Sequence, residues 1–495
     1  MSKPASIVAI VGRANVGKSS LFNAVIGRRE AIVAREAGTT RDSITARASY
    51  GGKDFWLVDT AGMKSAEDKF ELSIQEQITE AASSANLIVV VVEADVPITE
   101  DDRRIATLAL KSQKPVILVV NKIDKNQKAD LGNWQKLGIK PIIATSTTQK
   151  RGLTELLEAI STNLPKARIK QDRNRIRLAL LGRPNVGKSS LFNALGAKQQ
   201  AIVSERAGTT RDVNRLVVRY HEREIELMDT AGIRRSGKIE RGVEQFSVLR
   251  ALAAIEESDI GLLLMDAGEL NVQLDQKIAG QVKEAGKGLV LVVCKWDSID
   301  KDAFTRDQLA PQIAHEFAFV PWAPLIFTSA VSGQNVSKIF DLVLEITANR
   351  SEKFKTTELN NWLQGALNQH PPAALKGRQP KLNYIVQELE YYDYPRGSHF
   401  DAAQGAGEQR TETYRRYDEG AAEPATQRSA KSSRRISGSA GKQARAMRAS
   451  EPSFKIFGAH TRFLHWSYIR YLERSFREKW PLAGTPLKFW FIEKH

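Results

Sequence analysis

The chain has 495 residues, a net charge of +16 and a single cysteine, Cys294. Its length exceeds what one hydrophobic core usually organises, so we expect about three domains. One cysteine excludes an internal disulfide framework and predicts a reducing compartment. No apolar run reaches the roughly 20 residues that a membrane-spanning helix needs. No signal peptide is evident either, so we expect a cytoplasmic protein.

The positive charge is uneven along the chain. Residues 351–495 hold 24 Lys and Arg residues against 15 Asp and Glu residues, an excess of +9. An excess of this kind favours a polyanionic partner, either nucleic acid or an anionic membrane surface. Mild basicity without a binding role is the plain alternative.

An internal repeat at an offset of 170 residues organises the chain. Segment 12–24 reads Gly-Arg-Ala-Asn-Val-Gly-Lys-Ser-Ser-Leu-Phe-Asn-Ala, and segment 182–194 repeats it with Pro in place of the first Ala. The other repeated motifs are Ala-Gly-Thr-Thr-Arg-Asp at 37–42 and 207–212, and Asp-Thr-Ala-Gly at 59–62 and 229–232. A period of this length indicates two copies of a whole domain rather than a solenoid.

Each copy alternates short apolar runs with longer helical patterns. Continuous runs of β-branched and Leu residues are typical of strands buried on both faces of a parallel sheet. We therefore predict two α/β domains, each a mostly parallel sheet with flanking helices. The predicted strands are 7–11, 55–58, 87–92, 116–120 and 141–144 in the first copy, and 177–181, 224–228, 260–265, 288–293 and 325–327 in the second.

The region from residue 351 onward has a different pattern and predicts a small α+β domain. Predicted helices lie at 356–369 and 465–479, and predicted strands at 381–387, 453–457 and 486–492. An insertion at about 388–450 is rich in Gly, Ala, Ser, Arg and Glu, a composition that predicts disorder. Within it, the segment 428–448 holds seven basic residues and no acidic residue, and these seven are candidate RNA-binding residues. These are Arg428, Lys431, Arg434, Arg435, Lys442, Arg445 and Arg448.

Each copy of the repeat carries a P-loop pattern, Gly-x4-Gly-Lys-Ser, after an apolar strand and before a helix. Its glycines let backbone N–H groups surround a phosphate, and the helix N-terminus adds a positive dipole end. Lys18 and Lys188 are predicted to reach the β- and γ-phosphates, and Ser19 and Ser189 to ligate Mg²⁺. The other predicted nucleotide-binding residues of the loops are Gly12, Arg13, Ala14, Asn15, Val16, Gly17, Gly182, Arg183, Pro184, Asn185, Val186 and Gly187.

The base is indicated by a motif that follows the strand 116–120. Asp124 is predicted to accept hydrogen bonds from the N1–H and the exocyclic amine of guanine, whereas adenine would leave this carboxylate unpaired. Asn121 is predicted to contact guanine and to tie this loop to the P-loop. Lys122 is predicted to pack along the base plane. The remaining predicted base-contacting residues of the first copy are Ile123 and Ser146.

The second copy differs in this motif, because Cys294 stands where the first copy has Asn121. Asp297 keeps the predicted guanine preference, but a thiol is a poor hydrogen-bonding substitute for a carboxamide. The other predicted base-contacting residues are Lys295, Trp296, Ser329 and Ala330.

Further residues are predicted to respond to the γ-phosphate. Asp59 and Asp229 end strands and are expected to hold Mg²⁺ through water, and Thr40 and Thr210 to complete its ligand shell. Thr39 and Thr209 remain alternatives, since neighbouring threonines are not separated by sequence. Gly62 and Gly232 are expected to bind the γ-phosphate through their amides. The other predicted nucleotide-binding residues of these motifs are Thr60, Ala61, Met63, Thr230, Ala231 and Ile233.

The residues after these glycines predict slow hydrolysis. Many GTPases place there a Gln that orients the attacking water. Met63 and Ile233 do not hydrogen-bond water. Asn15 and Asn185 are candidate ligands of a monovalent cation that would spread the charge developing on the phosphates. The alternative is that these asparagines only cap the P-loop.

Taken together, the tandem motifs resemble one family, the double Era-like GTPases known as Der or EngA, over nearly the whole chain. The third region resembles the KH-like domain of that family, which lacks the usual GxxG loop. Its matching segments are Glu358 to Leu363, His370-Pro-Pro, Lys376 to Leu382, Tyr468 to Glu473 and Gly484 to Leu487. The resemblance implies GTP or GDP with Mg²⁺ in both copies, potassium dependence linked to the P-loop asparagine, and assembly of the large ribosomal subunit. Cys294, Thr147 and the insertion depart from the family pattern.

These observations predict a cytoplasmic, monomeric GTPase that binds the large ribosomal subunit and its RNA under nucleotide control, with no membrane association. The predicted domains are a first GTPase domain at 1–164, a basic linker at 165–174, a second GTPase domain at 175–350 and the KH-like domain at 351–495. The alternatives are a GTPase of tRNA modification, an RNA scaffold with a structural nucleotide, and a GTPase at a membrane surface.

Overall fold

The computed structural model describes most of the three predicted regions. The described residues are 5–27, 32–33, 45–60, 74–125, 131–164, 175–197, 214–229, 248–270, 273–299, 305–374, 377–388 and 451–493. The predicted linker, the seven candidate RNA-binding residues of the insertion, and both pairs of candidate threonines lie outside this set. The chain divides into two units, and the second, residues 389–446, also lies outside it.

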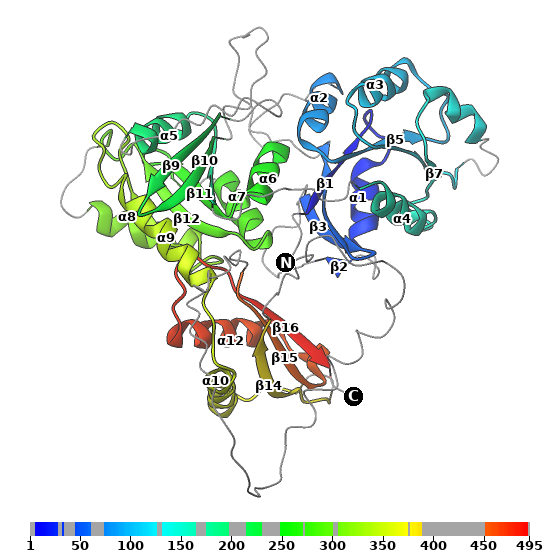
Figure 1. Ribbon diagram of the computed structural model, residues 1–495. Coiled ribbons are helices and arrows are strands. Elements are labelled where there is room, and N and C mark those ends of the chain that lie inside the picture. The colour runs from blue at the N-terminus through cyan, green and yellow to red at the C-terminus, as the bar shows by residue number, and fades with distance from the viewer. Residues whose placement is uncertain are drawn as a thin grey trace, which may run out of the picture. The chain divides into compact units, whose positions relative to one another are not determined.

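The first α/β domain is built on a sheet with the strand order β2-β3-β4-β1-β5-β6-β7 (Figure 1). Strands β4, β1, β5, β6 and β7 are parallel, and β2 and β3 pair antiparallel at one edge. The strands are β1 (Ser6–Val11), β2 (Ile32–Val33), β3 (Thr45–Tyr50), β4 (Lys53–Asp59), β5 (Leu87–Glu93), β6 (Val116–Asn121) and β7 (Ile142–Ala144). The helices are α1 (Lys18–Ile26), α2 (Ile74–Ser84), α3 (Glu100–Lys111), η2 (Leu131–Leu137) and α4 (Leu153–Asn163).

The second α/β domain repeats this architecture with the order β13-β12-β11-β8-β10-β9. All neighbouring strands are parallel except β10 and β9. The strands are β8 (Arg175–Leu181), β9 (Asn214–Tyr220), β10 (Arg223–Asp229), β11 (Ile260–Asp266), β12 (Gly288–Cys294) and β13 (Leu325–Phe327). The helices are α5 (Lys188–Ala197), α6 (Val248–Glu257), α7 (Gln273–Glu284), α8 (Thr305–Glu316) and α9 (Lys338–Arg350).

These sheets confirm the predicted mostly parallel α/β fold, and each predicted strand overlaps an observed one. The continuous apolar runs are buried on both sides, as in β5, where all seven residues are buried. In the first domain α1 and α4 cover one face through residues such as Leu21 and Leu157. Helices α2 and α3 cover the other face through residues such as Ile78 and Ile105. Burial on both faces explains why the apolar runs are continuous rather than alternating.

The antiparallel strands β2 and β3 of the first sheet and β9 of the second were not predicted. The hairpin between β3 and β4 turns at Gly51 and Gly52, which have φ values of 57° and 73°. Two consecutive positive φ values are what a type I′ hairpin turn requires, and Gly-Gly is one of its sequence signals. The second domain makes the corresponding turn at His221 and Glu222, with φ values of 43° and 61°. His221-Glu222 is not a sequence signal for this turn. Only the first hairpin therefore has a turn signal in the sequence.

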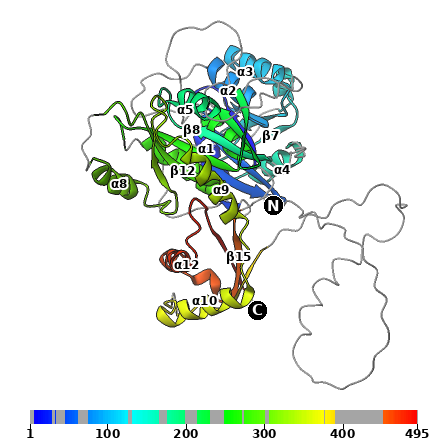
Figure 2. The ribbon, with the colours of Figure 1, turned by 60° about the vertical axis from the view of Figure 1, so that its left-hand side comes forward.

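The third region forms the predicted small α+β domain. Its sheet has the order β14-β15-β16, with β14 and β15 antiparallel and β15 and β16 parallel. Helices α10 and α12 lie on the same side of this sheet in both views (Figures 1 and 2). Their apolar residues pack on Phe454 and Ile456 of the central strand. The elements are α10 (Thr356–Gln369), β14 (Lys381–Gln387), β15 (Ser453–Ala459), η3 (Thr461–Phe463), α12 (Trp466–Lys479) and β16 (Lys488–Glu493).

Among the described helices, none combines the length and the hydropathy needed to cross a bilayer.

Candidate functional site

The predicted site residues of each α/β domain lie at one edge of its sheet. In the first domain the P-loop follows β1, Asp59 ends β4, Asn121 ends β6 and Ser146 comes shortly after β7. Since these strands are parallel, their carboxyl ends meet at the same edge, where ligands bind in open α/β sheets (Figure 1). The corresponding residues of the second domain are Gly182, Asp229, Cys294 and Ser329.

Each P-loop lysine is held by carbonyl groups of its own loop. Lys18 Nζ donates hydrogen bonds of 2.7 Å to the carbonyl oxygens of Gly12 and Arg13. Lys188 makes the same two bonds in the second domain, to Gly182 at 2.9 Å and to Arg183 at 2.5 Å. Both lysines are buried, with 5% and 7% of their surface exposed. The backbone therefore positions a charged ammonium group at the loop that would surround the phosphates.

Backbone geometry explains the glycines of the P-loop. A Cβ atom on Gly12 would lie 2.5 Å from the carbonyl oxygen of Val91, and one on Gly182 would lie 2.6 Å from that of Leu264. Gly17 has a φ of 93°, and a Cβ there would lie 2.4 Å from Asn121 Nδ2. Any larger residue would push the loop away from the neighbouring strands.

The P-loop asparagines have a conformational role of their own. Asn15 and Asn185 adopt left-handed backbones, with φ values of 66° and 60°. Asn tolerates this region better than most residues. The side chains of Asn15 and Asn185 are exposed. Thus asparagine suits these positions whether or not its side chain also binds a cation.

A hydroxyl and a carboxylate lie together beside each P-loop. Ser19 Oγ donates to Asp59 Oδ2 at 2.5 Å, and Ser189 Oγ donates to Asp229 Oδ2 at 3.1 Å. Both aspartates are buried, with 3% and 2% exposed. Hard oxygen ligands of this kind are those that Mg²⁺ prefers, so the residues present fit a magnesium site. Residues 61–63 and 230–233, together with Thr40 and Thr210, lie outside the described residues.

In the first domain Asn121 joins the base-recognition loop to the P-loop. Its side chain is 0% exposed, and its Nδ2 donates to the carbonyl oxygen of Val16 at 3.0 Å. Its Oδ1 accepts a bond of 3.1 Å from Thr145 Oγ1. Ser146 donates to Asp124 at 2.5 Å, and this bond is the main reason why the pKa of Asp124 is lowered. An ionised Asp124 is the form that accepts two hydrogen bonds from guanine.

The lysines of these motifs have acidic partners that the sequence did not predict. Lys122 Nζ donates to the carbonyl oxygen of Asn15 at 2.7 Å and to Glu93 at 2.8 Å. In the second domain Lys295 Nζ donates to Asp266 at 2.7 Å. Burial would raise the pKa of Asp266, but bonds from Lys295 and the Gly268 amide hold it below its usual value. The sequence feature that could have indicated these partners is the acidic residue that ends β5 and β11. Both residues lie at the same edge of their sheet as the P-loop.

Cys294 lacks the contacts of Asn121. Its Sγ lies 3.9 Å from Thr328 Oγ1 and 4.0 Å from the carbonyl oxygen of Val292. Among the described contacts, no hydrogen bond joins Cys294 to the second P-loop. A Cβ on Gly187 would approach only the Cys294 Cβ, at 3.9 Å. Burial raises the pKa of the thiol to about 12, so Cys294 is a neutral, poor donor.

The other predicted residues of the second base loop lie nearby. Trp296 is buried and packs on Phe327, with ring centroids 4.6 Å apart. Ser329 is 0% exposed, and its Oγ accepts a bond of 3.0 Å from the Ser332 amide. Asp297 is exposed at the surface. Asp297 thus corresponds to Asp124 of the first domain.

Comparison with known proteins decides the family. A family described as 50S ribosome-binding GTPase matches residues 7–122 and 177–295, and the C-terminal KH-domain-like family of EngA bacterial GTPase enzymes matches residues 426–491. GTPase Der of Gemmatimonas aurantiaca is 36% identical over 99% of this chain and 98% of its own. GTPase Der of Chloroflexus aggregans is 37% identical over 98% of this chain and 97% of its own. The chain belongs to the Der (EngA) family of GTPases.

Membership of the Der family confirms the predicted double GTPase with a KH-like domain. As a Der-family GTPase, the chain binds GTP and GDP with Mg²⁺. Among solved structures, the G domain of the T. maritima FeoB iron transporter is 31% identical and covers 32% of this chain and 99% of that chain. Its TM-score is 0.25, which is too low for a structural argument.

Each GTPase domain of this Der-family chain also holds an ion pair that was not predicted. Arg13 Nε lies 3.4 Å from Asp102 Oδ1, and Arg183 Nε lies 3.3 Å from Asp275 Oδ2. Both aspartate side chains are 1% exposed and lie in the first turn of the helix after the neighbouring strand. Because Arg13 and Arg183 also supply carbonyls to the P-loop lysines, each pair links that helix to the P-loop.

The buried carboxylate of Asp275 predicts a pH-dependent stability. Burial raises its pKa to about 6, although Arg183 opposes the shift. An acid with a raised pKa binds more protons in the folded state, so its stabilising contribution is lost as pH rises through about 6. We expect the free energy of unfolding of the second domain to fall by up to about 3 kcal/mol from pH 4 to pH 8 through this group.

Urea unfolding of the full chain across this pH range checks the expectation, with Asp275→Asn as the comparison. The Asn side chain does not titrate, so the variant is expected to lose this part of the pH dependence. Loss of the ion pair with Arg183 shifts its stability at every pH, and the slope is therefore the informative quantity. Equal slopes in the two proteins would contradict the expectation.

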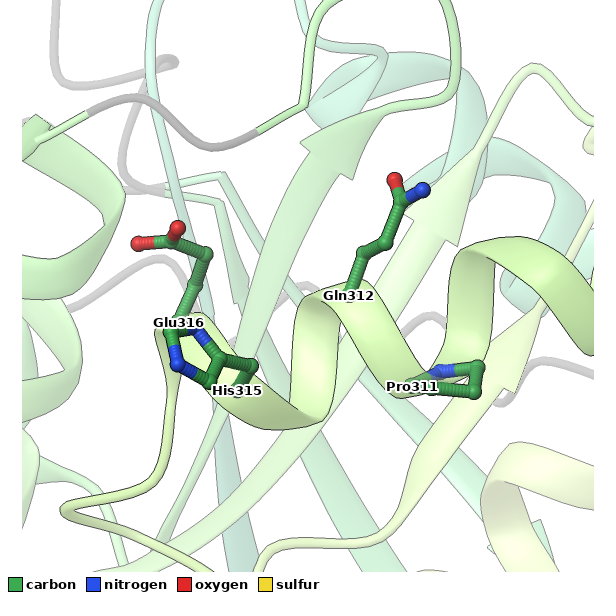
Figure 3. Close-up of a pocket in the computed structure, with 4 residues that line it drawn as sticks. All are labelled: Pro311, Gln312, His315 and Glu316. Atoms are coloured by element: carbon green, nitrogen blue, oxygen red, sulfur yellow. The ribbon is translucent and has the colours of Figure 1, made fainter.

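A surface hollow of about 360 Å³ lies beside helix α8 (Figure 3). It is lined by Pro311, Gln312, His315 and Glu316, all from helix α8. None of these residues belongs to a nucleotide-binding motif. The nucleotide site therefore rests on the loops at the sheet edge, and the hollow is not part of it.

Proposed function

We propose that this chain binds the large ribosomal subunit through its RNA, under the control of guanine nucleotide in both domains, and acts in assembly of that subunit. The observation that carries the proposal is the duplicated arrangement in which two loop carbonyls hold Lys18 and Lys188. Family membership supports the partner, since the matching family is described as ribosome-binding. The basic excess after residue 351 supports a polyanionic partner.

The residues divide the work of nucleotide recognition. Lys18 is placed to neutralise phosphate charge, and the adjoining backbone amides supply further donors. Ser19 and Asp59 would hold the Mg²⁺, which would offset negative charge on the phosphates. Asp124, kept ionised by Ser146, selects guanine. We therefore propose that the nucleotide bound to each domain, GTP or GDP, controls binding to the ribosomal subunit.

The partner is tested by sedimenting purified large ribosomal subunits with the full chain. Three states are compared: with a non-hydrolysable GTP analogue, with GDP and without nucleotide. We expect the fraction that cosediments with subunits to depend on the nucleotide. Equal cosedimentation in all three states would leave a scaffold with a structural nucleotide, and absence of binding in all three would refute the proposed partner.

Potassium is expected to accelerate hydrolysis relative to sodium at equal ionic strength. The reason for this expectation is that each P-loop has an exposed asparagine, Asn15 or Asn185. In addition, Met63 and Ile233 offer no hydrogen bond to the attacking water. A cation at the phosphates would offset charge that develops during hydrolysis. The measurement is the steady-state rate of phosphate release in the two salts.

A glycine variant separates the two roles of this asparagine. Asn15→Gly permits the left-handed backbone, since glycine adopts positive φ readily, but removes the carboxamide. With Lys188→Ala present to silence the second domain, the variant is expected to bind nucleotide and to lose the potassium preference. A preference retained by Asn15→Gly would assign Asn15 to the backbone role alone.

A further inference from the structure

One end of the KH-like domain exposes arginines together with aromatic rings. The residues come from the loop before β14, from η3 and from the exposed side of α12. We call these six residues the arginine–aromatic face: Arg378, Arg462, Phe463, Trp466, Arg470 and Arg474.

Three guanidinium groups of this face lie over its aromatic rings. The Cζ atoms of Arg462 and Arg378 lie 5.0 and 5.5 Å from the ring centroid of Phe463. Arg470 Cζ lies 4.6 Å from the ring centroid of Trp466. These distances are within the range of cation–π attraction. The rings therefore hold the arginines close to one another despite their like charges.

Helical spacing places the other members on one side of α12. Trp466, Arg470 and Arg474 are four residues apart, and all three are exposed. The core side of the same helix is formed by Leu472 and Phe476, which are both 0% exposed. Phe463 precedes Trp466 by three residues, so their Cα atoms lie within about 11 Å of each other. The six residues thus form two neighbouring groups, one around Phe463 and one along α12 from Trp466.

The acidic groups beside this face do not cancel its charge. Glu493 lies 3.9 Å from Arg462, and Glu478 lies 3.2 Å from Arg474. The two arginine side chains are 62% and 84% exposed, and ion pairs at such positions contribute little. Among the described ion pairs of this face, two carboxylates stand against four guanidinium groups, which leaves a net positive charge. At its centre Trp466 is 47% exposed, which is unusual for so large an apolar side chain.

We propose that the arginine–aromatic face binds an unpaired segment of RNA, with a base stacked on Trp466 and the guanidinium groups at the flanking phosphates. The inference rests on the proposed function and adds the place and the mode of binding. Sequence-tolerant binding of single strands combines aromatic stacking with a positive surface that follows the backbone. An arginine already lying over a ring directs its N–H edge outward, where it suits phosphate oxygens. An acidic protein surface would need the charges but not the exposed tryptophan.

Two full-length variants test the two parts of the proposal. Trp466→Ala removes the stacking surface, and the combined replacement of Arg378, Arg462, Arg470 and Arg474 by Gln removes the charges. Trp490→Ala is the matched control for the first, because Trp490 is 41% exposed and has Lys488 Nζ 4.4 Å from its ring, but lies on β16. Arg219→Gln controls for loss of an exposed arginine elsewhere. Circular dichroism and thermal unfolding of every variant check that the KH-like domain remains folded.

The probe is a fluorescent oligouridine of about 12 nucleotides, titrated at several salt concentrations, with an RNA duplex and polyglutamate as competitors. Trp466→Ala is expected to weaken oligouridine binding about 5- to 100-fold with little change in salt dependence. The arginine variant is expected to flatten the log–log salt slope by up to about 3. The control variants are expected to bind as the unmodified chain does, and the duplex to compete poorly.

The outcomes separate this inference from the proposed function. If unmodified chain binds ribosomal subunits and oligouridine while both face variants bind equally well, RNA binding stands and this face is not its site. If only the arginine variant loses binding and polyglutamate competes as well as RNA, the face binds an acidic partner and the inference fails. If the unmodified chain binds neither subunits nor oligouridine, the proposed function fails as well.

Discussion

Lys18→Ala is expected to weaken guanine-nucleotide binding at the first site at least about 100-fold. The side chain is buried among loop carbonyls and carries the positive charge nearest the predicted phosphates. Hydrogen bonds to charged groups contribute about 1.5–3 kcal/mol each, and two such bonds to phosphate oxygens account for a change of this size. The variant also leaves the carbonyls of Gly12 and Arg13 without their donor.

The duplicated domain provides the control for this experiment. Lys188→Ala is expected to abolish binding at the second site and to leave the first intact, so each single variant should bind one equivalent of nucleotide. Equilibrium dialysis with labelled GDP counts the equivalents, and the double variant should bind none. Two equivalents bound with unchanged affinity by either single variant would refute its P-loop assignment.

Asn121→Cys is expected to weaken guanine-nucleotide binding at the first site about 10- to 100-fold. The change gives the first domain the residue that the second domain carries. It removes the bond to the Val16 carbonyl and leaves the Thr145 hydroxyl without its acceptor, both in a buried place. Each unsatisfied buried group costs about 1–3 kcal/mol. Part of this cost weakens nucleotide binding, because the loop around the base is less well ordered.

The reverse change, Cys294→Asn, is expected to tighten binding at the second site by a few-fold to about tenfold. One recovered hydrogen bond contributes about 0.5–1.5 kcal/mol. The thiol contacts the Val292 carbonyl and Thr328 only at 3.9 to 4.0 Å, so its replacement breaks no strong bond. Each affinity is measured with Lys188→Ala or Lys18→Ala silencing the other site. Weaker binding by Cys294→Asn would show that the second pocket is packed around sulfur.

The central strands and the site edge were predictable because one physical cause dominates each. The run 87–92 of β5 is apolar throughout because both of its faces are covered. Parallel strands then bring their carboxyl ends to one edge, so the motifs at Gly12, Asp59 and Asn121 had to lie near one another. The spacing of glycines and lysine required by a phosphate loop leaves few alternatives.

The parts that were missed depend on contacts between distant segments. β9 is an edge strand whose turn at His221 and Glu222 carries no glycine signal. Asp102 and Asp275 look like ordinary acidic residues of a first helical turn. Only the folded chain shows that each lies against an arginine of a P-loop. Glu93 ends a predicted strand, but only the folded chain shows that Lys122 contacts it.

The single thiol of the chain, Cys294, allows local unfolding of the second domain to be measured directly. Cys294 is 5% exposed and ends a central strand, and its raised pKa keeps the reactive thiolate scarce. A thiol reagent therefore reaches it mainly when the strand separates from its neighbours. Since no other cysteine competes, the labelling rate reports how often this one domain opens. Measured with and without nucleotide, that rate gives the stabilisation of the second domain by its ligand without introducing any foreign probe.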